Sequence, residues 1–205
     1  MDPIPLGSIP GHYAETLGPD RLCLTYPDGS LSWAELDRRA NRIARLFAEI
    51  GVRQDDLVTL ALPNGLRFHE ACFAIWKLGA TPHVVSPRLP QVEFTAIADL
   101  AKPRLIVGVS DGVLANHRTL PGDFAVDGHS DEPVAVRVAK HWKAMSSGGS
   151  TGRPKIIVDH NPATTDPDEW ILDIPRDACL LNLGPLYHNA PFVCSHYWLF
   201  RGNHI

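Results

Sequence analysis

The chain has 205 residues, of which 44% are hydrophobic and 20% are charged, so its composition matches ordinary globular domains and excludes disordered and fibrous classes. Its formal net charge of −4 gives no electrostatic reason to expect a nucleic-acid partner. No apolar run reaches the ~18–20 residues of a membrane span, and the first residues lack the basic and apolar regions of a signal peptide. We therefore expect a cytoplasmic protein.

A hairpin followed by a long helix is predicted near the N-terminus. Asp28-Gly29 is a strong turn signal between two short apolar strands. Ser32 and Glu35 then have the spacing of a capping box, which predicts a helix whose apolar residues recur at helical spacing up to Ile50. The elements expected as far as residue 109 are strands at 22–26 and 31–33, a helix to residue 50, a strand at 57–62, a buried helix at 68–78, a strand at 83–85, a helix at 91–101 and a strand at 105–109.

This alternation of apolar strands and helices predicts an α/β fold with a mostly parallel sheet covered by helices on both faces. The segment 111–133 is irregular in pattern and is expected on the surface, with one short strand at 124–126. The polar stretch 160–169 either folds over a ligand of the segment before it or serves as a connector. A strand at 179–183 and a helix from Pro191 complete the expected elements.

The sequence contains four cysteines without any C-x-x-C spacing, in apolar surroundings: Cys23, Cys72, Cys179 and Cys194. This pattern predicts reduced thiols in the core and no disulfide. His188, Cys194 and His196 do not have a standard zinc-ligand spacing. On a helix from Pro191, Cys194 and His196 would lie about 200° apart, so we expect neither a metal site nor a Cys–His catalytic pair.

The segment from Ser146 to Lys155 holds three glycines, four hydroxyl side chains and one terminal lysine. Glycines allow the backbone to turn N–H groups toward one point, and hydroxyl and ammonium groups add donors and charge, so the segment has the chemistry of a phosphate-binding loop. It is not a Walker A loop, because Arg153-Pro154 separates the last glycine from the lysine. On composition alone, a flexible Gly/Ser linker is the alternative.

A second candidate group, Tyr187-His188-Asn189, stands between the expected strand at 179–183 and the helix from Pro191. Such a junction lies at the carboxyl edge of a parallel sheet, where open α/β sheets bind ligands. His188 could bond a carboxylate or an acyl phosphate, and Tyr187 and Phe192 offer apolar surface. The alternative is a histidine that caps the helix or is satisfied in the core.

The order of residues in Ser147–Lys155 resembles the phosphate-binding signature of the adenylate-forming superfamily, which includes acyl-CoA synthetases, luciferases and peptide-synthetase adenylation domains. The segment Gly184–Phe192 is similar to the substrate-side motif of the acyl-CoA synthetase branch. Leu31–Leu36 and Trp76–Ala80 are similar to two further family motifs. The resemblance implies that the chain is part of the large N-terminal domain of an AMP-forming synthetase.

The resemblance also implies an activity: ATP converts a carboxylic acid to an acyl adenylate with release of pyrophosphate, and the acyl group then passes to coenzyme A. In this interpretation His188 lies beside the acyl carboxylate. The acyl pocket would be lined by Tyr187, Asn189 and Phe192. The residues implied to hold the ATP phosphates are Ser147, Gly148, Gly149, Ser150, Thr151, Gly152 and Lys155.

Family motifs for adenine, magnesium and ribose binding, and the adenylating lysine, do not occur in these residues. We therefore expect residues 1–205 to be a single N-terminal α/β subdomain without the small C-terminal domain, inactive alone, with no magnesium ligand of its own. A P-loop phosphohydrolase is disfavoured by the Pro154-Lys155 order. A non-catalytic phosphate-binding module and a carrier protein as acyl acceptor remain alternatives. The Gly184–Phe192 motif resembles ligases of fatty, bile and related bulky acids more than peptide synthetases.

Overall fold

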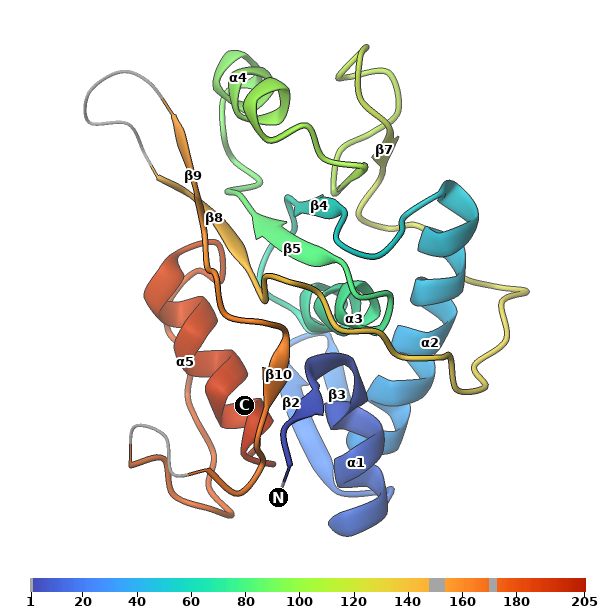
Figure 1. Cartoon of the computed structure of the whole chain (residues 1–205), viewed down its shortest axis with the longest axis vertical. Coiled ribbons are helices and arrows are strands. Elements are labelled where there is room, and N and C mark those ends of the chain that lie inside the picture. Colours follow the sequence, from blue (N-terminus) through green and yellow to red (C-terminus); the bar gives the residue numbers. More distant parts are fainter. Residues whose placement is uncertain (1, 148–153, 170–172) are drawn as a thin grey trace.

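The computed structural model describes residues 2–147, 154–169 and 173–205. Its centre is a six-stranded sheet with the order β7-β6-β4-β5-β8-β9 (Figure 1). Every neighbouring pair is parallel except β8 and β9, which are antiparallel. The strands are β4 (Leu57–Leu60), β5 (Thr81–Val84), β6 (Leu105–Val107), β7 (Thr119–Leu120), β8 (Ala144–Ser147) and β9 (Lys155–Val158).

Helices cover both faces of this sheet, as the alternating pattern predicts. Helix α3 (Leu66–Lys77) contacts β4 and β5, and α2 (Trp33–Ile50) packs on α3. Helix α4 (Gln91–Ala101) lies on the opposite side (Figure 1). Successive strand side chains point to opposite faces, so Leu105 and Val107 join the larger core while Ile106 joins the α4 core. The predicted fold class is confirmed.

Local sequence signals explain the helices on the α2 and α3 side. The Ser32 side chain accepts a hydrogen bond from the Glu35 N–H while the Glu35 carboxylate accepts one from the Ser32 N–H, so the predicted capping box is present. Gly51 ends α2 in the left-handed conformation, at φ 106°. Helix α3 is buried over nearly all of its length, which agrees with its lack of a polar face.

Two strands expected in the second half of the chain do not form. Residues 124–126 form no strand; β7 takes the edge position and Phe124 is buried in the larger core. Residues 179–183 make only one bridge, from Cys179 to His204. The apolar run has no further strand partner among the described residues, so Leu181 and Leu183 are 78% and 86% exposed.

The expectation of four core thiols is also only half right. Cys23 and Cys72 are buried, whereas Cys179 and Cys194 are exposed. Cys179 lies in the poorly paired segment described above, and Cys194 is on the outer side of α5 (Asn189–Phe200), opposite the buried His196. The helix thus separates Cys194 from His196 as the spacing predicts, and it begins two residues before Pro191.

Small elements close the lower part of the molecule around both termini. Residues Ile4 and Pro5 of β1 pair with β10 (Thr164–Thr165), and β10 lies beside the N-terminus (Figure 1). The stretch 160–169 is therefore a connector. Ile205 exchanges backbone hydrogen bonds with Cys23 and Thr25 of a hairpin strand. The remaining elements are a 3-10 turn (Leu6–Ser8), α1 (Ile9–Thr16), β2 (Leu22–Tyr26) and β3 (Gly29–Ser32).

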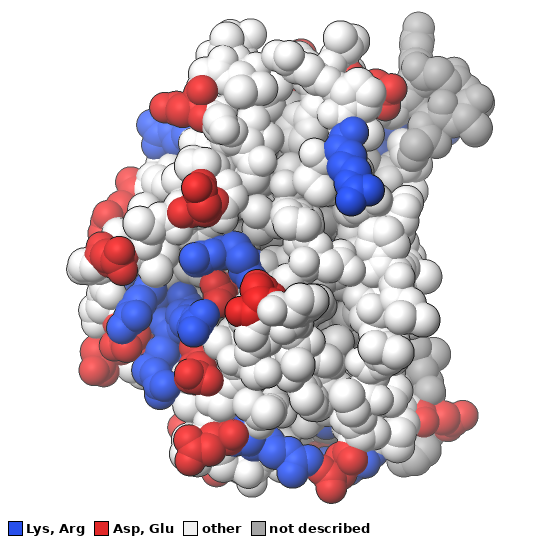
Figure 2. All heavy atoms as spheres, turned by 180° about the vertical axis from the view of Figure 1, so that it is seen from behind, with Lys and Arg blue, Asp and Glu red and all other residues white. Residues whose placement is uncertain are grey.

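Charged side chains of both signs are interspersed on the face seen in Figure 2, mainly along one side of the molecule. Ion pairs join several of them across elements, such as Arg42 to Asp131 at 2.8 Å and Arg39 to the buried Glu70 at 3.1 Å. None of the described helices is long and apolar enough to cross a membrane.

Candidate active site

Strands β8 and β9 form a hairpin that carries the predicted phosphate-binding segment. Ser147 ends β8, Lys155 begins β9, and the two residues are paired in the ladder. The hairpin therefore brings the first and last of the proposed phosphate ligands together. The intervening ligands predicted from the sequence, Gly148–Gly152, lie outside the described residues, and their role remains a prediction.

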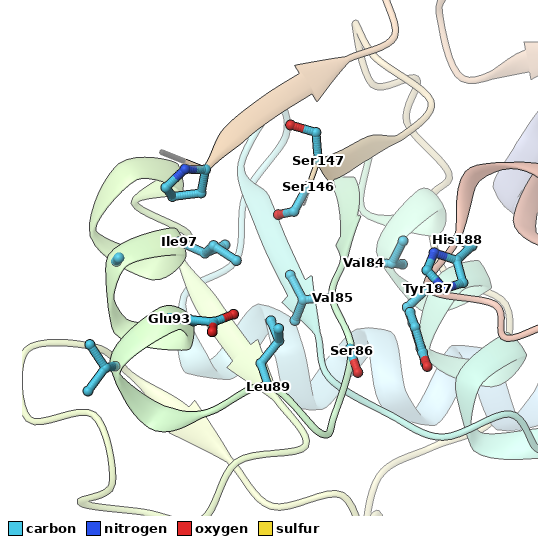
Figure 3. Close-up of a pocket in the computed structure, with 13 residues that line it drawn as sticks. Val84, Val85, Ser86, Leu89, Glu93, Ile97, Ser146, Ser147, Tyr187 and His188 are labelled. Carbon is cyan, nitrogen blue, oxygen red and sulfur yellow. The ribbon is translucent and has the colours of Figure 1, made fainter. Parts of the chain in front are cut away.

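A cavity of about 530 Å³ opens beside this hairpin (Figure 3). It lies at the carboxyl ends of β5 and β8, which are parallel neighbours, and this is the edge at which open α/β sheets bind ligands. Figure 3 shows the side chains of α4 on one side of the cavity and those of Tyr187 and His188 on the other. The lining is mostly aliphatic, with Ser86, Glu93, Ser146 and Ser147 as further polar members.

The turn that bears His188 is fixed to the rest of the sheet edge by one side chain. Asn64, just after β4, donates from Nδ2 to the Gly184 carbonyl at 2.9 Å and accepts the Leu186 N–H at 2.8 Å. His188 then stands at the N-cap position of α5 without a capping hydrogen bond from its side chain, and it is exposed. The imidazole is therefore free to contact a ligand in the cavity that Ser147 also lines.

Of the three proposed acyl-pocket residues, one lines the cavity and two do not. Tyr187 lines the cavity, with its ring centroid 4.7 Å from that of His188. Asn189 is exposed at the start of α5, outside the cavity lining. Phe192 is fully buried, with its ring 4.1 Å from that of His196. In the structure Phe192 is thus a core residue, because its position on α5 points toward α3 and not toward the cavity.

The sequence does not predict Glu93 and Asn64 as residues of this edge, and it predicts Ser146 only as one hydroxyl of the phosphate-binding segment. Glu93 in the first turn of α4 faces the cavity (Figure 3). Asn64 anchors the His188 turn, although the sequence indicated only a turn at Pro63-Asn64-Gly65. Ser146 lines the cavity although the signature begins one residue later. The run of hydroxyl residues before Gly148 was the available signal for Ser146.

The described residues contain no group of three or more His, Cys, Asp or Glu side chains placed to hold a metal ion. Among the residues that the structure describes, Glu93 is the only carboxylate that lines the cavity. A single carboxylate is a poor ligand set for Mg²⁺, which takes an octahedral shell of oxygens. The residues described here do not by themselves fit a magnesium site.

A family profile described as "AMP-binding enzyme" matches residues 13–205. The chain belongs to this family. Its curated relatives include the salicyl-AMP ligase / salicyl-S-ArCP synthetase of Mycobacterium tuberculosis, 30% identical over 86% of this chain and 37% of the relative. Another is the 2,3-dihydroxybenzoate-AMP ligase of Bacillus subtilis, 30% identical over 87% of this chain and 36% of the relative. The chain thus spans about a third of the length of these AMP-binding relatives.

Solved structures show the same fold at lower identity. The N-terminal domain of FACL13 from Mycobacterium tuberculosis has a TM-score of 0.78 at 22% identity, covering 97% of this chain and 56% of that chain. The o-succinylbenzoate coenzyme A synthetase MenE from Bacillus subtilis, in complex with AMP, has a TM-score of 0.77 at 19% identity, covering 98% of this chain and 55% of that chain. The architecture is therefore that of the N-terminal domains of adenylate-forming synthetases.

Proposed function

We propose that these residues form the phosphate-facing and acid-facing edge of an ATP-dependent, AMP-forming ligase that activates a carboxylic acid as its acyl adenylate. The supporting observation is the shared cavity, in which Ser147, at the start of the phosphate-binding segment, and His188 line one space. Adenylation requires both anions to meet at one α phosphorus. Placing their binding groups around one cavity at the sheet edge serves this purpose.

The chain contributes positioning and charge neutralisation to the reaction. The N–H groups and hydroxyls of the segment that begins at Ser147, together with the Lys155 ammonium, hold the β and γ phosphates. His188 orients the carboxylate, whose oxygen forms a bond to the α phosphorus. The bond from the α phosphorus to the bridging oxygen breaks, and its electron pair leaves with pyrophosphate. The aliphatic walls of the cavity exclude water from the reacting groups.

The proposal extends to the class of carboxylic acid and to the acceptor of the acyl group. The motif Gly184–Phe192 favours coenzyme A as acceptor and a fatty, bile or similar acid. The names of the two curated relatives favour an aromatic acid, and one of them is a salicyl-S-ArCP synthetase. We favour an aromatic acid because these matches extend over most of the chain, and retain coenzyme A and a carrier protein as the two acceptors to be tested. We also propose a cytoplasmic location, where ATP is available.

Phosphate binding can be tested on the 205-residue chain by titration with pyrophosphate. The backbone amide signals of Ser147 and Lys155 should shift, and Lys155→Ala should weaken the binding about tenfold or more, as expected for a charge-assisted contact. Lys140→Ala is the matched control, since Lys140 is an exposed lysine that precedes β8 and pairs with Asp55, before β4, at the amino edge of the sheet. A folded sample without shifts at millimolar pyrophosphate would contradict the phosphate site.

Catalysis is tested separately, by acid-dependent exchange of pyrophosphate into ATP. We expect no exchange from residues 1–205 alone, because these span about a third of the relatives' length. Exchange with an aromatic acid such as salicylate is expected of any longer form that supplies the remainder of that length. Exchange by residues 1–205 that is lost in Lys155→Ala would show that the chain is catalytically self-sufficient. Failure of exchange with every acid in such a longer form would favour a non-catalytic phosphate-binding module.

A further inference from the structure

A row of polar side chains crosses the α4 face of the sheet and ends in the cavity. Thr59 of β4 and His83 of β5 are paired in register, and His83 is paired with Ala144 of β8. Ser146 follows two residues after Ala144, so it points to the same face. The other neighbour of Thr59 across the sheet, Ile106, is part of the apolar α4 core. The row is thus a line of polar side chains within an otherwise apolar face of the sheet.

Hydrogen bonds link the row from the core to the cavity. Thr59 Oγ1 lies 2.9 Å from His83 Nδ1, and His83 Nε2 lies 2.8 Å from Ser146 Oγ. Thr59 and His83 are 1% and 0% exposed, while Ser146 lines the cavity. Burial of a hydroxyl and an imidazole is costly unless both are hydrogen-bonded, and here each ring nitrogen has one partner.

The direction of these hydrogen bonds follows from the hydroxyl proton of Thr59. Within the described part of the chain, His83 Nδ1 is the one hydrogen-bond partner of Thr59 Oγ1. The buried Thr59 O–H must therefore donate to Nδ1, which is unprotonated. In the neutral ring the proton is then on Nε2, and Nε2–H donates to Ser146 Oγ. That oxygen is used as an acceptor, so the Ser146 O–H remains available to a ligand.

We propose that Ser146 is a ligand-binding residue of this cavity, held by His83 so that its hydroxyl donates a hydrogen bond to an anionic oxygen of the ligand. The proposal rests on the adenylating function above, in which two anionic oxygens enter the cavity: a phosphate oxygen of ATP and a carboxylate oxygen of the acid. His83 is a positioning residue, because it reaches the ligand only through Ser146. Burial lowers the pKa of His83 to about 4, so the imidazole stays neutral and keeps a single N–H donor near pH 7.

The tautomer of His83 is the first test, and it needs no ligand. Nitrogen-15 NMR of the histidine-labelled chain distinguishes an Nε2–H ring from an Nδ1–H ring. We expect Nε2–H at His83 at pH 7. An Nδ1–H ring, or a ring that titrates near pH 6.5, would overturn the proposal, because Ser146 would then not be fixed as a donor.

The second test compares two probes, pyrophosphate and salicylate, against Ser146→Ala. We expect about tenfold or greater loss of affinity for at least one probe, as for a hydrogen bond to a charged group. Loss with pyrophosphate alone assigns the bond to a phosphate oxygen, loss with salicylate alone assigns it to the carboxylate, and loss with both assigns one subsite to both oxygens. Ser195→Ala is the matched control, since Ser195 is a buried serine of α5 outside the cavity lining.

Variants of His83 separate positioning from a purely structural role. His83→Leu should weaken the same probe as Ser146→Ala. His83→Gln, whose amide N–H can replace Nε2–H, should retain most of the affinity. If a folded Ser146→Ala chain binds both probes as tightly as the unaltered chain, the proposal is overturned and the adenylating function still stands. If the unaltered chain binds neither probe, the function itself falls, and this proposal falls with it.

Discussion

Two histidines, one at the N-cap of α5 and one within it, illustrate how burial separates a proposed site residue from a core residue. His188 is exposed at the N-cap of α5 and lines the cavity. His196, two turns further on, is 0% exposed, and its Nδ1–H donates to the Phe192 carbonyl at 2.8 Å. Because both are histidines, residue type alone does not distinguish their roles. Their roles follow from the surface that each turn of the helix presents to the rest of the fold.

We expect opposite effects from alanine at these two positions. His188→Ala should change the free energy of unfolding by no more than about 0.5 kcal/mol, since it removes an exposed side chain. His196→Ala should cost about 2–5 kcal/mol, because it leaves a cavity among Phe68, Trp76 and Phe192. Urea unfolding at pH 7.5 measures both. A steep fall of the urea midpoint in His188→Ala would refute its assignment as a site residue.

At the scale of elements, the α2–α3 contact encloses an ion pair. Lys77 of α3 is 3% exposed, and its Nζ lies 2.7 Å from Asp37 Oδ1 of α2. Burial lowers the pKa of Lys77, while the Asp37 carboxylate acts against this shift. Asn41 on α2 also donates to the carboxylate at 3.0 Å. The pair is therefore desolvated and depends on both partners.

Asp37→Asn should destabilise the chain by about 3–5 kcal/mol, because it leaves the Lys77 ammonium buried without its counterion. Lys77→Met in the same chain should restore most of this loss, since the apolar stem remains and the charge is gone. Asp131→Asn is the control: its pair with Arg42 is partly exposed and should cost about 1 kcal/mol or less. Equal losses for the two aspartates in urea unfolding would refute the buried-pair interpretation.

The helices were predictable from the sequence because their signals are local. The capping box of α2 and the apolar surface of α3 need only residues within one or two turns. The prediction of a strand at 179–183 was wrong because an apolar run forms a strand only beside a partner strand. The described residues provide a single bridge there. The cavity was foreseen at the sheet edge. The link between His83 and Ser146 was not, because it joins residues 63 positions apart across two strands.

At the scale of the whole molecule, three buried neutral histidines make stability depend on pH. His69, His83 and His196 are all 0% exposed. Burial lowers the pKa of His83 and of His196 to about 4 and that of His69 well below its ordinary value. In the unfolded chain each ring titrates near pH 6.5. Between these values the unfolded state binds protons that the native state does not.

We therefore expect full stability above about pH 6.5 and a fall as the pH drops toward about 4, with each histidine contributing up to roughly 1.4 kcal/mol per pH unit. Urea midpoints measured from pH 7.5 to pH 4.5 should follow this fall. His196→Phe should flatten the slope, because phenylalanine suits its aromatic surroundings and binds no proton. Asp159→Asn is the control: the pKa of Asp159 is lowered below 3.8, so its contribution is lost only at more acidic pH. A slope in His196→Phe equal to that of the unaltered chain would show that buried histidines do not set the acid limit of this fold.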